Sequence, residues 1–269
     1  VGVPAQQMLR SLGVKTIFSD ALDRAACLRA GDRLSPTVPW EVNREIFGAV
    51  QLCRSRVDGV ILMRTFVEDE QIDFLQTKNV PFVTIGSTSA NYKGVIQIDH
   101  NHKSACKELT SIILMKQMDK IALIGGNEEH VVTQSRLRGF REAYAKMGKT
   151  LDVDLMFLSQ DNQVLVEKAV KEALNRQADC ILCMDDAVCS RVLKTLRQQH
   201  VKVPEDVRVA SFYNSMVLEN NVPSITSLSF DAKELGMVAC RTLLDLTEGL
   251  EVKERTLLPY EVVLKESTK

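Results

Sequence analysis

Polar residues follow both strands of a strand–helix–strand unit that we predict between residues 178 and 214. Asp185–Asp186 comes directly after the apolar run 178–184, and Tyr213–Asn214 follows the second apolar run, 207–212. Two strands joined by a helix lie parallel, so their carboxyl ends meet at one edge of a sheet, where such sheets bind ligands. The pattern therefore indicates a polar ligand site, and it also predicts that one aspartate caps the intervening helix.

Two other spacings could carry metal or redox chemistry, and we interpret both structurally. Cys180 and Cys183 form a C-x-x-C string, but they lie within a predicted strand, where residues three apart point to opposite faces. His100 and His102 are two residues apart, without a third ligand in sequence reach. We therefore expect no metal site and no cofactor.

Catalytic motifs are missing from the sequence. It holds no nucleophile elbow, phosphate-binding loop or spaced metal cluster, and the Gly125–Gly126 pair lacks the spacing of a dinucleotide fingerprint. The Asp185–Asp186 pair is explained by a helix cap and a binding edge. We expect that the chain is not an enzyme.

Strands alternate with helices along most of the chain. Apolar runs predict strands, and apolar residues at helical spacing predict helices. The predicted strands are 57–63, 81–85, 95–98, 120–126, 154–157, 178–184, 207–212 and 262–264. The predicted helices are 70–77, 103–115, 136–147, 163–176 and 231–248, together with one that begins at Asp185–Asp186 and ends by His200. This alternation predicts an α/β fold with parallel sheets, and about ten strands suit two Rossmann-like lobes.

Composition excludes several classes of protein. The 269 residues carry a net charge of -1, which argues against bulk electrostatic binding of nucleic acid. No stretch is long and apolar enough for a membrane helix, so we expect no membrane partner. The seven cysteines lie mostly in apolar runs, which fits a reducing cytoplasm better than a disulfide scaffold.

Several strings, in order, resemble the effector-binding core of lac-repressor/GalR-type bacterial transcription regulators, which have a periplasmic-binding-protein-like (type I) fold. The resemblance covers residues 50–267 and is carried by SRVDGVIL at 55–62, VPFVTIG at 80–86, MDKIALIGG at 118–126, SRLRGFREAY at 135–144, the segment 185–212, the segment 224–249, and LPYEVVLKEST at 258–268. It implies two lobes joined by three crossovers, with a small ligand between them. The N-terminal lobe would hold 14–98 and 228–249, and the C-terminal lobe 99–227 and 250–269.

The resemblance also implies ligand contacts in the C-terminal lobe. Arg136 matches a ligand-binding arginine of the family at the start of a helix, where its fork could bind a carboxylate or neighbouring hydroxyls. Asp185 matches a position that is commonly a ligand-contacting Asn. Tyr213 departs from the family, which often has a sugar-binding Asp there; its ring favours stacking on a sugar face or a planar base. Asn214 could supply part of the missing hydrogen bonding.

In the N-terminal lobe, Arg64 and Ser87 follow predicted strands, and Asp99 lies at the crossover between lobes. We expect all three to contact the ligand. The mixture of arginines and aspartates suits a neutral polyol or a zwitterion better than a phosphate ester.

Residues 1–13 resemble the family's hinge helix, which inserts an apolar side chain into the DNA minor groove; Met8 or Leu9 would be that wedge. An ordinary helix is the alternative. No helix-turn-helix module precedes residue 1, so we expect specific operator binding only through a module that this sequence does not contain. Residues 20–45 do not contain the Asn-Pro-Phe-type sequence that begins the first helix in this family.

The resemblance implies a ligand-sensing core that binds a sugar or related metabolite and alters DNA binding by a homodimer. The alternative is an exported solute-binding protein of a transporter. The cysteines, the hinge-like start and the VPEDV turn favour the cytoplasmic regulator.

Overall fold

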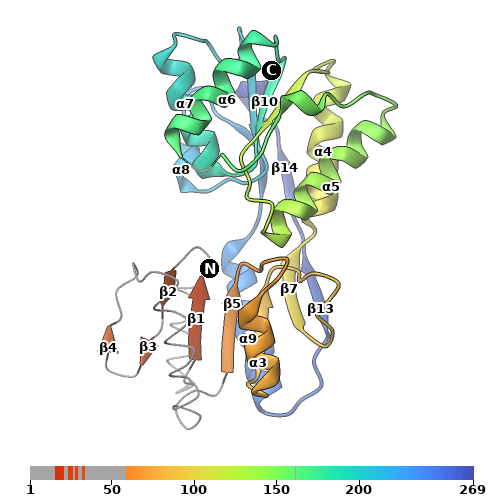
Figure 1. Cartoon of the computed structure of the whole chain (residues 1–269), viewed down its shortest axis with the longest axis vertical. Helices are drawn as coiled ribbons and strands as arrows, with labels where there is room; N and C mark the ends of the chain where they lie inside the picture. The colour runs from red at the N-terminus through yellow and green to blue at the C-terminus, as the bar shows by residue number, and fades with distance from the viewer. Residues whose placement is uncertain (1–15, 21–23, 27, 30–31, 34–58, 161) are drawn as a thin grey trace. The chain divides into compact units, whose positions relative to one another are not determined.

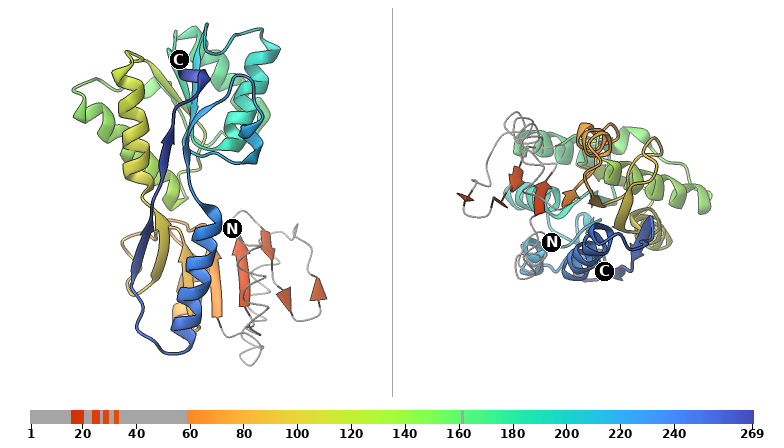
Figure 2. Two further views of the ribbon diagram at one scale, coloured as in Figure 1. Left: turned by 180° about the vertical axis from the view of Figure 1, so that it is seen from behind. Right: turned by 90° about the horizontal axis from the view of Figure 1, so that it is seen from below.

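The computed structural model of the chain describes residues 16–20, 24–26, 28–29, 32–33, 59–160 and 162–269. They fall into two compact units (Figures 1 and 2). Unit 1 contains the described residues up to His100 and the segment Asp231–Leu258, and unit 2 contains Asn101–Phe230 and Pro259–Lys269. The chain thus passes between the units three times, as expected. No helix among the described residues is long and apolar enough to cross a membrane.

Unit 1 is built on a mainly parallel sheet. Its strand order in the described residues is β13-β7-β6-β5-β1-β2, and only the β1–β2 pair is antiparallel. A separate antiparallel ladder joins β3 (Leu28–Arg29) to β4 (Asp32–Arg33). The sheet strands are β1 (Thr16–Asp20), β2 (Arg24–Ala26), β5 (Gly59–Met63), β6 (Phe82–Ile85), β7 (Ile96–His100) and β13 (Arg255–Leu258).

Both faces of the unit 1 sheet are buried, because alternate side chains along each strand point into opposite apolar clusters. Ile61 and Val83 pack with α9 (Ala232–Thr247), which Figure 2 shows lying along these strands. Val60 and Leu62 instead pack with α3 (Glu70–Thr77), which Asp69 caps by accepting from two backbone N–H groups of its first turn. The continuous apolar strands therefore reflect burial on both sides, as in other parallel sheets.

Unit 2 repeats the arrangement, with strand order β14-β12-β11-β10-β8-β9 in which only β12–β14 is antiparallel. One face is covered by α4 and α5, and the other by α6, α7 and α8 (Figure 1). The elements are α4 (His102–Met115), β8 (Ile121–Ile124), α5 (Val131–Lys146), η1 (Val153–Leu155), β9 (Met156–Phe157), α6 (Gln163–Asn175), β10 (Cys180–Cys183), α7 (Asp186–Gln198), β11 (Arg208–Ser211), α8 (Met216–Glu219), β12 (Thr226–Ser229), β14 (Glu261–Val263) and η2 (Glu266–Thr268).

The C-x-x-C string is structural, as predicted. Cys180 packs into the core on the α4–α5 side, and Cys183 packs into the core on the α6–α7 side. Both are free thiols and fully buried. Burial raises the pKa of Cys180 to about 12, which leaves it protonated and unreactive at neutral pH.

Two predicted boundaries were wrong. Helix α5 begins at Val131, and Arg136 lies in its second turn; the N-cap residue His130 makes no side-chain capping bond, so the sequence gives no start signal. The second segment of the N-terminal lobe extends past residue 249 to Leu258, because β13 pairs in parallel with β7 of unit 1.

The end of the chain is held in unit 2 by buried hydrogen bonds. Ser267 Oγ donates to Val209 O at 2.6 Å and accepts from Thr226 N at 2.9 Å. We predict that Ser267→Ala lowers the free energy of unfolding by about 1–3 kcal/mol, because it leaves a buried N–H and a buried carbonyl unpaired. Chemical denaturation measures this loss.

The control is Ser190→Ala, which removes a half-buried hydroxyl from α7 that makes no hydrogen bond to the described residues. Its stability should change by less than about 0.5 kcal/mol. Equal effects of the two substitutions would show that the Ser267 bonds do not hold the chain end.

Candidate functional site

Four strands of unit 2 end at the same edge of the sheet, because β8, β10, β11 and β12 run parallel. The residues that follow them include three of the four ligand contacts predicted in this unit. Gly125–Gly126 follows β8, Asp185 follows β10, Tyr213–Asn214 follows β11 and Phe230 follows β12. We call this group, together with Arg136 of α5, which donates to Met184 O at the end of β10, the unit 2 edge.

Gly125 lets the first turn of α7 approach the end of β8. Its φ of +100° is one that residues with a side chain rarely adopt. A Cβ there would also lie 2.7 Å from a methyl group of Val188 on α7. The glycine therefore sets how close the capping residue Asp185 comes to the neighbouring strand.

The two aspartates of the unit 2 edge have defined hydrogen-bond partners. Asp185 is the N-cap of α7, and its carboxylate accepts from Val188 N at 2.8 Å. Asp186 accepts from the hydroxyl of Ser215, in the segment after β11. The predicted capping role is thus confirmed for Asp185, and Asp186 ties the ends of two strands together.

Arg136 is the most unusual side chain of this edge. It is only 8% exposed, and its Nη1 donates to Met184 O at 2.7 Å, at the end of β10. Its buried Nε has no acceptor, and none of the described carboxylates forms an ion pair with it. The guanidinium is therefore anchored at the site but its charge is not neutralised by a contact.

Tyr213 belongs to a row of three rings. Its ring stacks on Phe230 with centroids 5.9 Å apart and planes 17° apart. Phe230 in turn meets the His102 ring edge-on at 4.8 Å. Burial and the Asp186 carboxylate raise the pKa of Tyr213, whereas Arg136 opposes that rise, so the phenol stays protonated and lies within electrostatic reach of both charges.

Asn214 turns toward the following short helix. Its Nδ2 donates to the Glu219 carboxylate, which Lys265 also contacts at 3.4 Å. This bond helps to lower the pKa of Glu219. Part of the hydrogen-bonding capacity of Asn214 is thus used within unit 2.

In unit 1, the structure brings Ser87 and Asp99 into direct contact. Asp99 Oδ2 accepts from both the backbone N and the Oγ of Ser87, at 2.8 and 2.7 Å, and its Oδ1 accepts from His100 N at 2.8 Å. Thr65 donates to Ser87 O, and Arg255 donates to Ser87 Oγ at 3.2 Å. Asp99 therefore holds the loop that carries Ser87.

Arg64 directly follows β5 and has a φ of +71°, an uncommon conformation for a residue with a side chain. Its N–H donates to Ile85 O at 3.2 Å, which extends the pairing of β5 with β6 by one residue. The left-handed turn at Arg64 ends the strand and directs the chain toward the buried Thr65.

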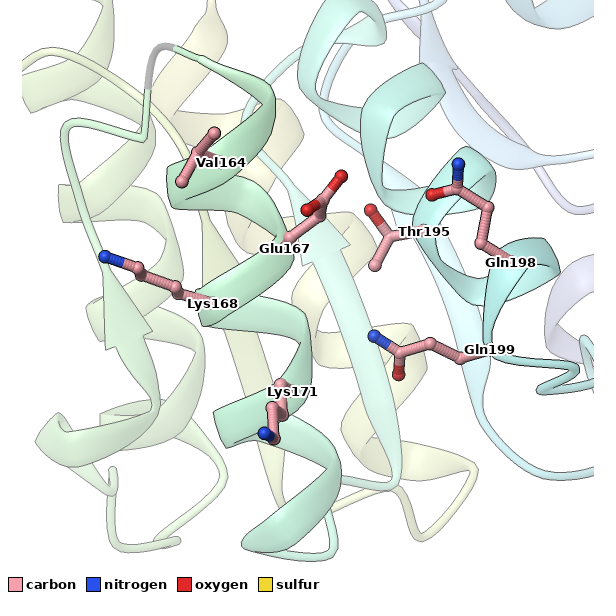
Figure 3. A pocket seen from close by; sticks show the side chains of 7 residues that line it. All are labelled: Val164, Glu167, Lys168, Lys171, Thr195, Gln198 and Gln199. Atoms are coloured by element: carbon pink, nitrogen blue, oxygen red, sulfur yellow. The ribbon is translucent and has the colours of Figure 1, made fainter.

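A groove of about 330 Å³ lies on the surface of unit 2 between α6 and α7 (Figure 3). None of the predicted ligand contacts lines it. Its walls are flexible polar side chains of the two helices together with one valine: Val164, Glu167, Lys168, Lys171, Thr195, Gln198 and Gln199. The described residues contain no group of three side chains that could hold a metal ion.

Comparison with known protein sequences shows the family of this chain. The catabolite control protein A of Staphylococcus aureus is 25% identical over 230 residues, which are 85% of this chain and 69% of that protein. The model of the periplasmic binding protein-like domain matches residues 113–268, more than half of the 269 residues. The chain belongs to the periplasmic binding protein-like domain family.

Solved structures agree with this family. The transcription regulator CcpA of Lactococcus lactis has a TM-score of 0.77 at 24% identity, over 86% of this chain and 84% of that one. The complex of the transcriptional regulator CelR with cellobiose has a TM-score of 0.75 at 26% identity, over 84% and 70%. The expected fold is confirmed, and so is the lac-repressor/GalR-type effector-binding core within this family.

Sequence reasoning missed three residues that shape the site of this family member. Phe230 and His102 complete the row of rings with Tyr213, and Arg255 reaches Ser87 from 168 positions away along the chain. Phe230 carried a detectable signal, because Leu228 and Phe230 alternate with two serines in the pattern of a strand. Met8 and Leu9, the expected DNA contacts, lie outside the described residues.

Proposed function

We propose that this chain is the sensing part of a transcription regulator, which binds a sugar or related metabolite and thereby alters DNA binding by a homodimer. The observation that carries the proposal is the unit 2 edge, where a buried Arg136 lies beside Asp185 and Tyr213 at the carboxyl ends of parallel strands. This is the place where sheets of this type bind ligands. The relatives named above are regulators, which disfavours the solute-binding alternative.

The contacts to the effector would come from both units. Unit 2 would offer Arg136, Asp185, Tyr213 and Asn214, and unit 1 would offer Arg64 and Ser87, with Asp99 holding Ser87 in place. A solved structure of a relative is the complex of the transcriptional regulator CelR with cellobiose, which supports a sugar-like ligand. Operator DNA would be bound through a helix-turn-helix module that this sequence does not contain.

The hydrogen bonds of Asp185 and Asp186 favour a role in binding rather than in catalysis. Asp185 is used as a helix cap and Asp186 accepts from Ser215. General acid–base catalysis needs a group that can exchange a proton with the substrate at near-neutral pH. We therefore propose that the effector leaves the site chemically unchanged.

A thermal-shift screen over sugars, polyols, nucleobases and amino acids tests the sensing role. At least one compound should raise the unfolding temperature in a concentration-dependent way, because a ligand that binds only the native state stabilises it. A screen in which no compound does so would contradict the proposal.

We predict a homodimer, and the exposed apolar residues around α8 support it. Met216 is 87% exposed, Val217 57% and Val222 88%. Such a patch is uncommon on a monomer and is typical of an interface. Light scattering at micromolar concentration should give twice the mass of the chain.

A matched pair of variants locates the interface of this dimer. Val222→Glu should shift the mass toward the monomer, because it places a charge in an apolar interface. Val164→Glu introduces the same charge on α6, at a valine that is 59% exposed, and should leave the dimer intact. A wild-type chain of monomer mass would rule out the homodimer, and equal behaviour of both variants would place the interface elsewhere.

A further inference from the structure

We propose that the effector is a ring compound that carries a single carboxylate, which Arg136 binds while the Tyr213 ring supports the flat face of the ligand. This inference rests on the proposed sensing function and names the chemical class of its ligand. The inference comes from a charge without a counterion and from a fixed aromatic row.

The charge of Arg136 lacks a partner in the unit 2 edge. The side chain is 8% exposed and makes one hydrogen bond to the described residues, from Nη1 to the neutral carbonyl of Met184. Its Nε is buried without an acceptor. Buried charges are normally paired, because an unpaired one loses its hydration without compensation. A ligand carboxylate would supply that pairing, and the guanidinium fork suits its two oxygens.

Other cations on α4 and α5 differ from Arg136. Lys103 and Lys107 of α4 both form ion pairs with Glu142 of α5, at 3.0 and 3.1 Å. Arg138, two residues after Arg136, is exposed to solvent. Arg136 thus differs from these three neighbours, because it is buried and forms no ion pair with the described residues.

The aromatic row gives the ligand its second feature. Tyr213 is half-buried and held by stacking on Phe230, which His102 contacts from the other end of the row. A ring fixed in this way is a preorganised surface for a flat ligand face. Arg136 donates to Met184 O at the end of β10, and β10 pairs in parallel with β11, the strand after which Tyr213 follows, so the guanidinium and the ring lie at neighbouring strand ends.

The charge balance of the edge favours a monoanion over a phosphate ester. Asp185 and Asp186 flank the site, and neither pairs with Arg136. One arginine and two carboxylates repel a dianionic phosphate about twice as strongly as they repel a monoanion. For a single carboxylate, direct contact with the Arg136 guanidinium has the smaller repulsion to overcome.

Two matched pairs of ligands test the proposal by calorimetric titration of the full chain. D-glucuronate is compared with D-glucose, and orotate with uracil; within each pair the ring is kept and the carboxylate is added. At least one acid should bind more than tenfold tighter than its neutral partner. This preference should be lost in Arg136→Gln and retained in Arg138→Gln.

The proposal is overturned if neither acid binds, if the neutral partner binds as tightly, or if Arg136→Gln keeps the preference for the acid. Binding of a neutral sugar without binding of either acid overturns the carboxylate inference and leaves the sensing function intact. A chain that binds none of the compounds of the wider thermal-shift screen contradicts the sensing function itself.

Discussion

Replacing Arg136 by glutamine should weaken effector binding by roughly 100-fold, because removing one partner of a buried, hydrogen-bonded charge pair costs about 2–5 kcal/mol. The fold should remain intact. Glutamine keeps an N–H group for Met184 O, which accepts from Arg136 Nη1 at 2.7 Å. The free energy of unfolding of the ligand-free chain should therefore change by less than about 1 kcal/mol. Calorimetry with a compound found in the screen, together with chemical denaturation, measures both quantities.

Arg138→Gln is the matched control for this variant. It removes the same charge from the same helix, at an exposed position. It should leave both affinity and stability close to those of the wild type. If Arg136→Gln binds as tightly as Arg138→Gln, the ligand site is not at the unit 2 edge. If Arg136→Gln unfolds instead, Arg136→Lys, which keeps the charge, separates loss of fold from loss of binding.

The second large effect concerns the packing of α4 against α5. Gly139 of α5 is buried, and a Cβ there would lie 2.3 Å from Lys103 O and 3.0 Å from Lys107 N. Both are backbone atoms of α4, so the helices would have to separate. We predict that Gly139→Ala destabilises the chain by about 2–3 kcal/mol, as overpacking does, although alanine alone favours a helix by about 1 kcal/mol over glycine. Denaturation monitored by circular dichroism measures this loss.

Gly148→Ala serves as the control for Gly139→Ala. Gly148 has a φ of +63° and no atom within 4 Å of an added Cβ, so only backbone strain opposes the substitution. That strain is worth about 1–2 kcal/mol. A Gly139→Ala variant as stable as the wild type would show that α4 and α5 adjust without loss.

The elements that the sequence predicted well are those with strong local signals. Helix α3 was predicted at its observed bounds, 70–77, because Asp69 caps it and an apolar stripe follows. Helix α7 was predicted from Asp185 and its regular apolar spacing. Strand β13 was missed because Arg255–Leu258 is a short, partly exposed edge strand that depends on pairing with β7, more than 150 positions earlier in the sequence.

The site was predictable as a set of positions but not as a set of interactions. Strand ends placed Asp185 and Tyr213 at one edge, and the structure confirms that placement. Arg136 lacks an ion-pair partner among the described residues because of the groups that surround its side chain in the fold. No local sequence pattern encodes those groups. The same holds for Asp99, whose oxygens accept from Ser87 and His100.

The central claim is that this chain binds a small molecule and does not transform it. Calorimetric titration of a compound from the thermal-shift screen, followed by NMR of the same compound after prolonged incubation, tests this most directly. We predict one bound molecule per chain and an unchanged spectrum of the compound. Conversion of the compound into a product that depends on the protein would contradict the account.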